Sequence, residues 1–393
     1  MTSGILGFDS NPRTRVVFGL NTIDRLGELA QGLSAHRALI VTDAGIVAAG
    51  HVDRACSALS AAGIAAVVFD GVRENPTTLD VDACLKAARS ADIDILIGLG
   101  GGSSMDTAKG CNFLLTNGGR MHDYWGVGKA TREMLPLIAI PTTAGTGSEC
   151  QSFALIADEN THAKMACGDP KAAARIALLD PLLTLSQPRG VAACTGIDAI
   201  SHAVETAVTR KRNALSQLYS REAFRLTINH LPGVLQEPDS LEDRARMLLG
   251  AAFAGTAIEN SMLGAAHSAA NPLTAHFGVI HGQAVGIMLP HIVRFNAEQP
   301  DTRELYRELA VFGGLARSDE SASVAVTALV TRLEAMLALA DMPPSLRDCG
   351  VDEAMIPELA REAESQWTAQ FNPRKPSLQD FEALYRSAFQ SGQ

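Results

Sequence analysis

The stretch from Asn260 to Val293 constrains this chain more than any other part of its sequence. It contains no Asp, Glu, Lys or Arg, yet it carries four histidines, His267, His276, His281 and His291. A stretch this apolar is expected to be deeply buried, and a buried polar group without a hydrogen-bond partner costs about 2–7 kcal/mol. The imidazoles therefore need partners, and we expect His267 and His281 to belong to a metal site.

Two further candidate ligands lie together in an earlier helical segment. Asp198 and His202 are four residues apart in the sequence GIDAISHAVE, a spacing that brings two side chains to one face of a helix. Such a pair alone is more often a local hydrogen bond. Together with His267 and His281 it makes one carboxylate and three imidazoles, a set that suits a divalent iron or zinc ion with one coordination position left open.

Short β-branched runs alternate with Ala-rich helical segments in the first half of the chain. This alternation predicts parallel βαβ units, with helices covering both faces of a sheet. The predicted strands are Arg15–Phe18, Ala38–Thr42, Ala66–Asp70, Ile93–Gly98 and Leu137–Ile140, followed by a hairpin or pair of strands near Phe153–Ile156 and Arg175–Leu179.

Long helical patterns replace the strands after Asp180. We therefore expect an α/β dinucleotide-binding domain over residues 1–185 and an all-helical metal-binding domain over residues 186–393, with a shared cleft. In the second domain, Pro272 and the glycines near Gly278 are expected to interrupt the helical pattern. Its clearest predicted helices are Ala203–Val208, Leu215–Leu231, Leu241–Ala257 and Ala322–Ala340, whereas Val52–Ala62 and Asp80–Ser90 are Ala-rich helical segments between the strands of the first domain.

A glycine-rich loop follows the fourth predicted strand, in the sequence IDILIGLGGGSSMDTAK from residue 93 to 109. Glycines let a backbone approach a pyrophosphate closely, and a helix N-terminus after them attracts its charge. Ser103 and Asp106 have the spacing of a capping box for that helix. The alternative is a tight strand–helix turn without a ligand.

Asp43, at the end of an earlier predicted strand, is a candidate for the ribose hydroxyls of a nucleotide. In the usual dinucleotide fingerprint the acidic residue follows the glycines by about 20 positions, whereas Asp43 precedes them. A carboxylate there would repel a 2′-phosphate and favour NAD over NADP, although Asp-Ala-Gly is also typical of a plain turn. The loop PTTAGTGSE at residues 141–149 either lines a nucleotide pocket or is an ordinary polar loop.

Composition excludes several other classes of protein. A net charge of −10 and an aromatic share of 5% argue against a nucleic-acid partner, which needs a basic surface and stacking side chains. No run of about 20 purely apolar residues is present, so we expect no membrane association. The seven cysteines form no C-x-x-C pair and no secretory signal is visible, which predicts reduced thiols in a cytoplasmic protein.

Four long motifs occur in one order along the chain: GGGSSMDTAK, PTTAGTGSE, GIDAISHAVE, and a pair of histidines with thirteen residues between them that is followed by LPHIVRFN. With FNPR at 371–374, they make the chain resemble the iron-containing (group III) alcohol dehydrogenases over essentially its whole length. The resemblance implies a Rossmann-like N-terminal domain with a parallel sheet, an all-α C-terminal domain and a cleft between them, as in dehydroquinate synthase.

The resemblance also implies which residues form the site. The implied metal ligands are Asp198, His202, His267 and His281. The residues implied to contact the cofactor are Asp43, Asn75, Gly100, Gly101, Gly102, Ser103, Asp106, Thr142, Thr143, Thr146 and Lys164. The implied cofactors are NAD, with NADP as the alternative, and Fe2+, with Zn2+ as the alternative, and the family commonly forms homodimers.

Asn271 departs from the family pattern. Family members commonly have a second histidine four residues after the one at position 267, beside the substrate and assigned to proton relay. Asparagine forms hydrogen bonds but does not titrate near neutral pH, so the proton would leave through water or a ribose hydroxyl. His276 is an alternative relay, although we expect a structural role for it and for His291.

These observations predict a metal-dependent alcohol dehydrogenase that transfers a hydride between a small alcohol and NAD(P) and reduces aldehydes or ketones in reverse. The ion would act as a Lewis acid on the substrate oxygen. Glycerol dehydrogenase-like and maleylacetate reductase-like oxidoreductases are the nearest alternatives. A dehydroquinate synthase-like lyase would need a basic cluster for its phosphorylated substrate, and a non-catalytic NAD-binding protein would not need the metal ligands.

Overall fold

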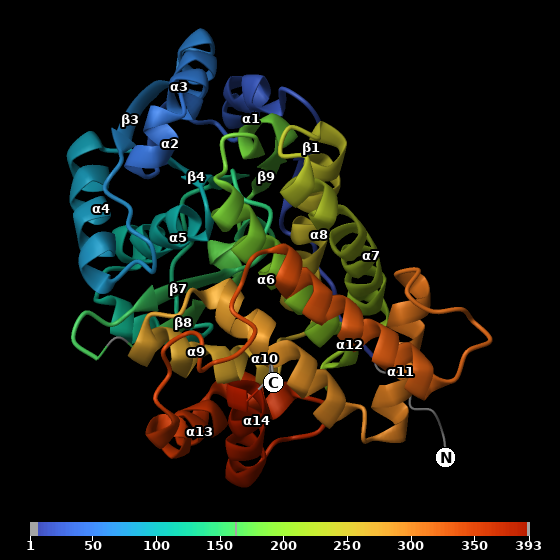
Figure 1. The fold of residues 1–393 in the computed structure, drawn as a ribbon. Helices are drawn as coiled ribbons and strands as arrows, with labels where there is room; N and C mark the ends of the chain where they lie inside the picture. Colours follow the sequence, from blue (N-terminus) through green and yellow to red (C-terminus); the bar gives the residue numbers. More distant parts are fainter. Residues whose placement is uncertain (1–6, 162, 391–393) are drawn as a thin grey trace. The chain divides into compact units, whose positions relative to one another are not determined.

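The computed structural model describes residues 7–161 and 163–390 of the chain (Figure 1). The chain forms two compact units, one from Asn11 to Gln187 and a second that comprises residues 7–10 and the chain from Pro188 onward. The first unit contains both β-sheets and the second consists of helices. This arrangement confirms the predicted fold class.

A parallel six-stranded sheet forms the centre of the first unit. Its strands lie in the order β1 (Arg15–Phe18), β9 (Ile176–Leu179), β6 (Leu137–Pro141), β4 (Ile95–Gly100), β2 (Arg37–Val41) and β3 (Ala65–Phe69). Every neighbouring pair in this sheet is parallel. The strand predictions for this sheet agree with the structure to within two residues at each end.

The second, smaller sheet corrects one part of the strand prediction. Residues 153–156 and 175–179 do not pair with each other. β7 (Phe153–Ala157) pairs antiparallel with β8 (Lys164–Gly168), a strand that the sequence did not predict, and β5 (Gly126–Val127) joins β8 in parallel. β9 instead completes the large sheet between β1 and β6, because its run Ile-Ala-Leu-Leu is buried on both sides.

Alternate residues of the central strands point into two separate cores. Ala38 and Ile40 of β2 belong to the core beneath α1 (Leu26–Gln31) and α3 (His51–Ala61). Leu39 and Val41 belong to the core beneath α4 (Thr78–Ala91) and α5 (Gly102–Asn117). The period of two along a strand thus buries both faces of the sheet, as doubly wound α/β proteins require. The remaining helices of this unit are α2 (Ala44–Ala48) and the 3-10 helices η1 (Thr22–Arg25), η2 (Met121–Tyr124), η3 (Ser148–Cys150), η4 (Pro170–Ala172) and η5 (Pro181–Thr184).

The second unit is built around α6 (Arg189–Val208), whose residues from Gly196 to Val208 are all buried. The helices that pack on it include α7 (Ala214–Gln236), α8 (Leu241–Glu259) and α10 (His281–Asn296). The others are α9 (Ala265–Phe277), α11 (Pro300–Phe312), α12 (Ala322–Leu339), α13 (Ile356–Ser365) and α14 (Leu378–Gln390), with the 3-10 helices η6 (Glu353–Met355) and η7 (Trp367–Phe371).

The uncharged stretch forms α9 and α10, and most of it is buried, as expected. The interruption predicted at Gly278 is confirmed, because this residue ends α9 in the left-handed conformation. The interruption predicted at Pro272 is wrong. Pro272 lies inside α9 and is buried there, and the packing of α9 against α10 and α13 outweighs the cost of a proline in a helix interior, about 3 kcal/mol.

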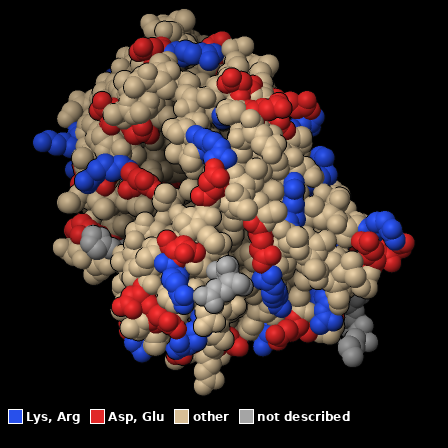
Figure 2. Space-filling model, viewed as in Figure 1, with Lys and Arg blue, Asp and Glu red and all other residues tan. Residues whose placement is uncertain are grey.

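The surface of the chain carries charges of both signs. Lys and Arg side chains are interspersed with Asp and Glu on the face shown in Figure 2. One helix among the described residues, α12, is long and apolar enough to cross a membrane by length and composition alone. In this structure one face of α12 is buried against its own unit, and Arg332 donates to the carbonyl of Ile228.

The close approach of α6 and α10 gives a first test of the packing. A Cβ at Gly282 would overlap the backbone carbonyl of Cys194, so we expect Gly282→Ala to force the two helices apart and to lower the free energy of unfolding by about 1–3 kcal/mol in urea denaturation. Gly190→Ala on α6 is the matched control, because a Cβ there meets no atom within 4 Å. Equal stability of both variants would contradict this packing.

Candidate active site

One carboxylate and three imidazoles converge in the helical unit. Oδ1 of Asp198 lies 3.3 Å from Nε2 of His267, 3.4 Å from Nε2 of His202 and 3.9 Å from Nε2 of His281. The ring of His267 stacks on that of His202 at 4.8 Å and is tilted against that of His281 at 5.4 Å between centroids. The structure therefore brings together all four residues that the sequence singled out.

The spacing of these atoms fits a single ion. The ligand atoms of Asp198, His267 and His281 all lie within 4.8 Å of one another. Ligand atoms about 2.0–2.2 Å from a tetrahedral ion lie about 3.4 Å apart, close to the distances from Asp198 to the imidazoles of His267 and His202. Asp198 and His202 come from one face of α6, His267 from the first turn of α9, and His281 from the first residue of α10.

In this cluster the charges of neighbouring side chains shift the pKa values of Asp198 and His267 in the direction opposite to that of burial. Burial alone would raise the pKa of Asp198, but the three imidazoles, His202 foremost, hold it well below its usual range. Burial alone would lower the pKa of His267, but the charges of Glu205 and Asp198 and their hydrogen bonds raise it to about 9. The carboxylate of Asp198 therefore stays ionised although it is buried among the three imidazoles.

Glu205 is a member of this site that the sequence analysis did not assign. It lies on α6, seven residues after Asp198, is buried, and its Oε2 contacts Nδ1 of His267. A spacing of seven residues puts both carboxylates on one face of the helix, so the sequence contained this signal within the motif GIDAISHAVE.

The other histidines of the uncharged stretch have partners elsewhere. His276 lies in the exposed last turn of α9, with Nε2 2.8 Å from Oε1 of Glu362, and is not part of the cluster. Nδ1 of His291 lies 2.9 Å from Oγ of Ser387, and burial lowers the pKa of His291 to about 4. Asn271 lies one turn after His267 on α9 and donates from Nδ2 to Oε1 of Gln366 at 3.1 Å.

The glycine loop lies where the strand order of the first unit reverses. From β2 the chain continues to β3 on one side, and after β4 it continues to β6 on the other. In open parallel sheets, ligands bind beyond the carboxyl ends of the strands at such a switch point. Asp43 follows β2, Gly101 follows β4 and Thr142 follows β6, so three predicted cofactor segments meet at this edge.

Close packing within these segments explains why glycine stands at positions 100 and 102. Gly100 has φ +148°, and a Cβ there would collide with Oγ of Ser104 and lie 3.6 Å from Oδ2 of Asp43. A Cβ at Gly102 would lie 2.8 Å from Cγ2 of Thr146. The backbone of Thr142 donates to the carbonyl of Gly100 at 2.9 Å. Gly100 and Gly102 therefore leave no room for a side chain on this path between Asp43 and the threonines.

The start of α5 differs from the predicted capping box. The helix begins at Gly102 with Gly101 as its N-cap, and no side chain caps it, so Ser103 lies inside the helix and the capping-box prediction is wrong. Asp106 instead accepts from Oγ of Ser148 at 2.8 Å, and Nζ of Lys109 donates to the carbonyl of Ser148 at 2.7 Å. The first amides of α5 thus remain without a side-chain cap, as a phosphate site needs.

Two carboxyl side chains are buried in the elements that follow the loops of this edge, Asp106 in α5 and Glu149 in η3. Burial raises the pKa of Asp106, against the opposing effects of Lys109, Ser148 and Lys164, so Lys164 acts on this carboxyl from β8. Burial also raises the pKa of Glu149 to about 7. Asn75, the remaining predicted cofactor contact, is exposed in the loop after β3 and has a positive φ of 51°.

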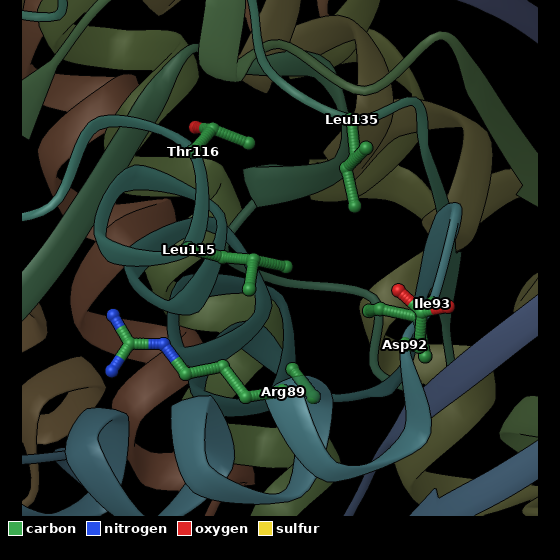
Figure 3. Close-up of a pocket in the computed structure, with 7 residues that line it drawn as sticks. Arg89, Asp92, Ile93, Leu115, Thr116 and Leu135 are labelled. Atoms are coloured by element: carbon green, nitrogen blue, oxygen red, sulfur yellow. The ribbon is translucent and has the colours of Figure 1, made fainter.

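A separate hollow of about 300 Å³ lies at the opposite end of β4 (Figure 3). It is lined by Ala88, Arg89, Asp92, Ile93, Leu115, Thr116 and Leu135. Asp92 and Ile93 precede β4, Leu135 precedes β6, and the other lining residues lie near the ends of α4 and α5, whereas the glycine loop follows β4. The hollow therefore lies at the amino ends of the strands, away from the edge where doubly wound sheets bind nucleotides.

Comparison with known proteins covers both units of the chain. Residues 12–181 match the family described as iron-containing alcohol dehydrogenase, and residues 192–389 match its C-terminal family. The chain is similar to lactaldehyde reductase of Escherichia coli (strain K12), with 34% identity over 95% of this chain and 97% of that protein.

Solved structures show the same fold. A 1,3-propanediol oxidoreductase aligns with a TM-score of 0.94 and 32% identity, covering 98% of this chain and 100% of that one. A sulfoacetaldehyde reductase from Bifidobacterium kashiwanohense, solved in complex with NAD+, aligns with a TM-score of 0.89 and 26% identity over 98% of this chain and 100% of that one. The chain belongs to the iron-containing alcohol dehydrogenase family and is a metal-dependent alcohol oxidoreductase.

Proposed function

We propose that this enzyme transfers a hydride between a small alcohol and NAD, and reduces the corresponding aldehyde or ketone in reverse. The observation that carries the proposal is the convergence of Asp198 with three imidazoles around one point. In this proposal residues 1–185 form the cofactor domain and residues 186–393 the metal domain.

The residues that would hold the ion are Asp198, His202, His267 and His281. Iron is the metal we propose, since the family is iron-containing, with zinc as the alternative that the same ligand set accepts. When bound, the divalent ion supplies Lewis-acid chemistry at the alcohol or carbonyl oxygen. The protein contributes a buried carboxylate whose Oδ1 lies 3.3–3.9 Å from Nε2 of three imidazoles.

The residues that would hold NAD are those at the carboxyl edge of the sheet. The uncapped first turn of α5 and the glycines before it would bind the pyrophosphate. Oδ1 of Asp43 caps α2, because it accepts from the backbone N–H groups of Gly45 and Ile46. Oδ2 lies beside the glycine loop, where it would bind the ribose of NAD and repel the 2′-phosphate of NADP. The full set is Asp43, Asn75, Gly100, Gly101, Gly102, Ser103, Asp106, Thr142, Thr143, Thr146 and Lys164.

The substrate class we propose is a short alcohol or aldehyde with a second oxygen. The support is twofold: relatives are named for lactaldehyde and 1,3-propanediol, which both have two oxygens, and Asn271 offers an amide one helical turn from His267. The amide pair of Asn271 and Gln366 would bind a substrate hydroxyl without a charge of its own. We further propose that the enzyme is a cytoplasmic homodimer.

Removal of one metal ligand tests the centre of this proposal. We expect Asp198→Asn and His281→Ala to bind Fe2+ at least about 100-fold more weakly, because removal of an outer partner of a ligand alone costs 10–100-fold, and to lose NAD-linked turnover. Metal analysis of anaerobically purified protein and an NADH absorbance assay measure both. His230→Ala, whose imidazole pairs with Asp243 on neighbouring helices, is the control. Full metal content together with full turnover in the ligand variants would contradict the assignment.

Asp43→Asn tests cofactor choice without loss of the helix cap, since asparagine caps helices as well as aspartate. We expect the preference for NAD over NADP, measured as the ratio of kcat/KM values, to fall about tenfold or more because the charge that repels the 2′-phosphate is removed. The thermal midpoint should stay within about 2 °C. An unchanged cofactor ratio would remove Asp43 from the ribose site.

Asn271→His tests the departure from the family pattern. A histidine introduced there has an ordinary pKa of about 6.5 and accepts a proton only above it. We therefore expect kcat/KM for alcohol oxidation to acquire a new rise between about pH 6 and 7. Asn271→Gln is the control, because it keeps an amide that does not titrate. The same pH profile in both variants would show that position 271 does not exchange a proton with the substrate.

A further inference from the structure

We propose that Glu205 and Asn372 are positioning residues of the metal site, which fix the first turn of α9 and the imidazole of His267 so that Nε2 faces Asp198. The inference rests on the proposed metal site and extends it to two residues that do not bind the ion. The motif FNPR, to which Asn372 belongs, has no other role in the proposed chemistry.

Glu205 contacts α9 through both carboxylate oxygens. Oε2 contacts Nδ1 of His267, and Oε1 accepts from the backbone N–H of Ala266 at 2.7 Å. An ionised carboxylate only accepts hydrogen bonds, so this contact places a hydrogen on Nδ1 of His267 and leaves Nε2 as the nitrogen for a metal. A partner of this kind sets the tautomer and the ring orientation of a histidine ligand.

Asn372 holds the same turn of α9 from a segment far along the chain. Its Oδ1 accepts from the backbone N–H of Ala265 at 3.2 Å, and its Nδ2 donates to Oδ1 of Asn296 at 2.7 Å and to the carbonyl of Arg374 at 2.6 Å. The side chain is 1% exposed. Both hydrogens of its amide are therefore used within the protein, and its oxygen is shared between the first turn of α9 and Nδ2 of Asn296, which donates to it at 3.2 Å.

The two side chains meet at Gly264, the N-cap of α9. Gly264 has no side chain with which to cap the helix. A Cβ there would lie 2.8 Å from Oδ1 of Asn372 and 3.2 Å from Oε1 of Glu205. The two oxygens thus occupy the position of a cap and satisfy two of the free amides of the first turn, directly beside His267.

The FNPR segment also contacts the ends of the two other ligand-bearing helices. The carbonyl of Phe371 accepts from N of Arg210 at 2.8 Å and from Oγ1 of Thr209 at 3.0 Å, just after α6. The guanidinium of Arg374 lies 3.8 Å from the ring centroid of Phe295 near the end of α10. One segment therefore fixes α6, α9 and α10, the three helices that carry the four ligands.

The variant Glu205→Gln separates positioning from packing. Glutamine has the same shape, and its oxygen can still accept from Ala266, but its amide nitrogen would then oppose the N–H of His267. We expect the dissociation constant for Co2+, measured on apo-protein by competition with a chelator, to rise 10–100-fold, with a changed visible absorption of the bound Co2+. Asn372→Ala should give a smaller rise, and the two effects should not be additive, because both act through one turn.

The control for general damage to α9 is Tyr385→Phe. The Tyr385 hydroxyl is buried and donates to the carbonyl of Ala269 on the same helix at 2.7 Å, without contact to the ligands. We expect this variant to lower thermal stability but to keep its Co2+ affinity within about threefold of the wild type. Equal losses of Co2+ affinity in Tyr385→Phe and Glu205→Gln, at similar losses of stability, would overturn the positioning role.

A third variant separates this inference from the proposed function. Asp198→Asn should weaken Co2+ binding more than Glu205→Gln does. If Asp198→Asn binds Co2+ like the wild type, the metal site itself is misplaced and the proposed function fails. If Asp198→Asn loses Co2+ while Glu205→Gln keeps wild-type affinity and spectrum, the metal site stands and the positioning role is wrong.

Discussion

The arrangement of the ligand-bearing helices depends on the pairing of the buried Asp198 carboxylate with three imidazoles. An isolated charge in an apolar interior would be protonated or paired, and this one is paired with three imidazoles whose Nε2 atoms lie 3.3–3.9 Å away. The partners come from three helices, so the site exists only where α6, α9 and α10 approach closely. Gly282 permits that approach on one side, because a side chain there would overlap Cys194.

Much of the fold followed from residue patterns, because the central strands are short apolar runs rich in Ile and Leu. Where prediction failed, contacts distant in sequence decided the outcome. β8 has the sequence KMACG, which contains no β-branched residue, and it is a strand because β7 pairs with it. Asp106 has the spacing of a capping residue, but Ser148 binds its carboxylate from a loop far along the chain.

The candidate metal site was more predictable than the partners around it. Few residue types bind metal ions in proteins. The four-residue spacing of Asp198 and His202 places both side chains on one face wherever the helix begins. The partners of His276 and His291, which are Glu362 and Ser387, come from the last helices and have no sequence signature. Glu205 lay between these cases, since its spacing was visible but its contact with His267 depends on where α9 begins.

The position of Asp43 before the glycines, rather than after them, follows from the strand order. In this sheet β2 and β4 are neighbours on either side of the point where the chain reverses its direction of winding. An acidic residue at the carboxyl end of either strand lies at the same edge of the sheet. The order of the acidic residue and the glycines along the chain therefore does not decide whether they lie close together. What matters is that Oδ2 of Asp43 lies beside the glycine loop.

Asn271 places a neutral amide one helical turn after His267. A histidine at this position would change its charge near its ordinary pKa of about 6.5. The pair formed by Asn271 and Gln366 carries no charge and offers hydrogen bonds at every pH. In the proposed site these amides would orient a polar substrate, and Asn271 itself would not take up the proton of the alcohol.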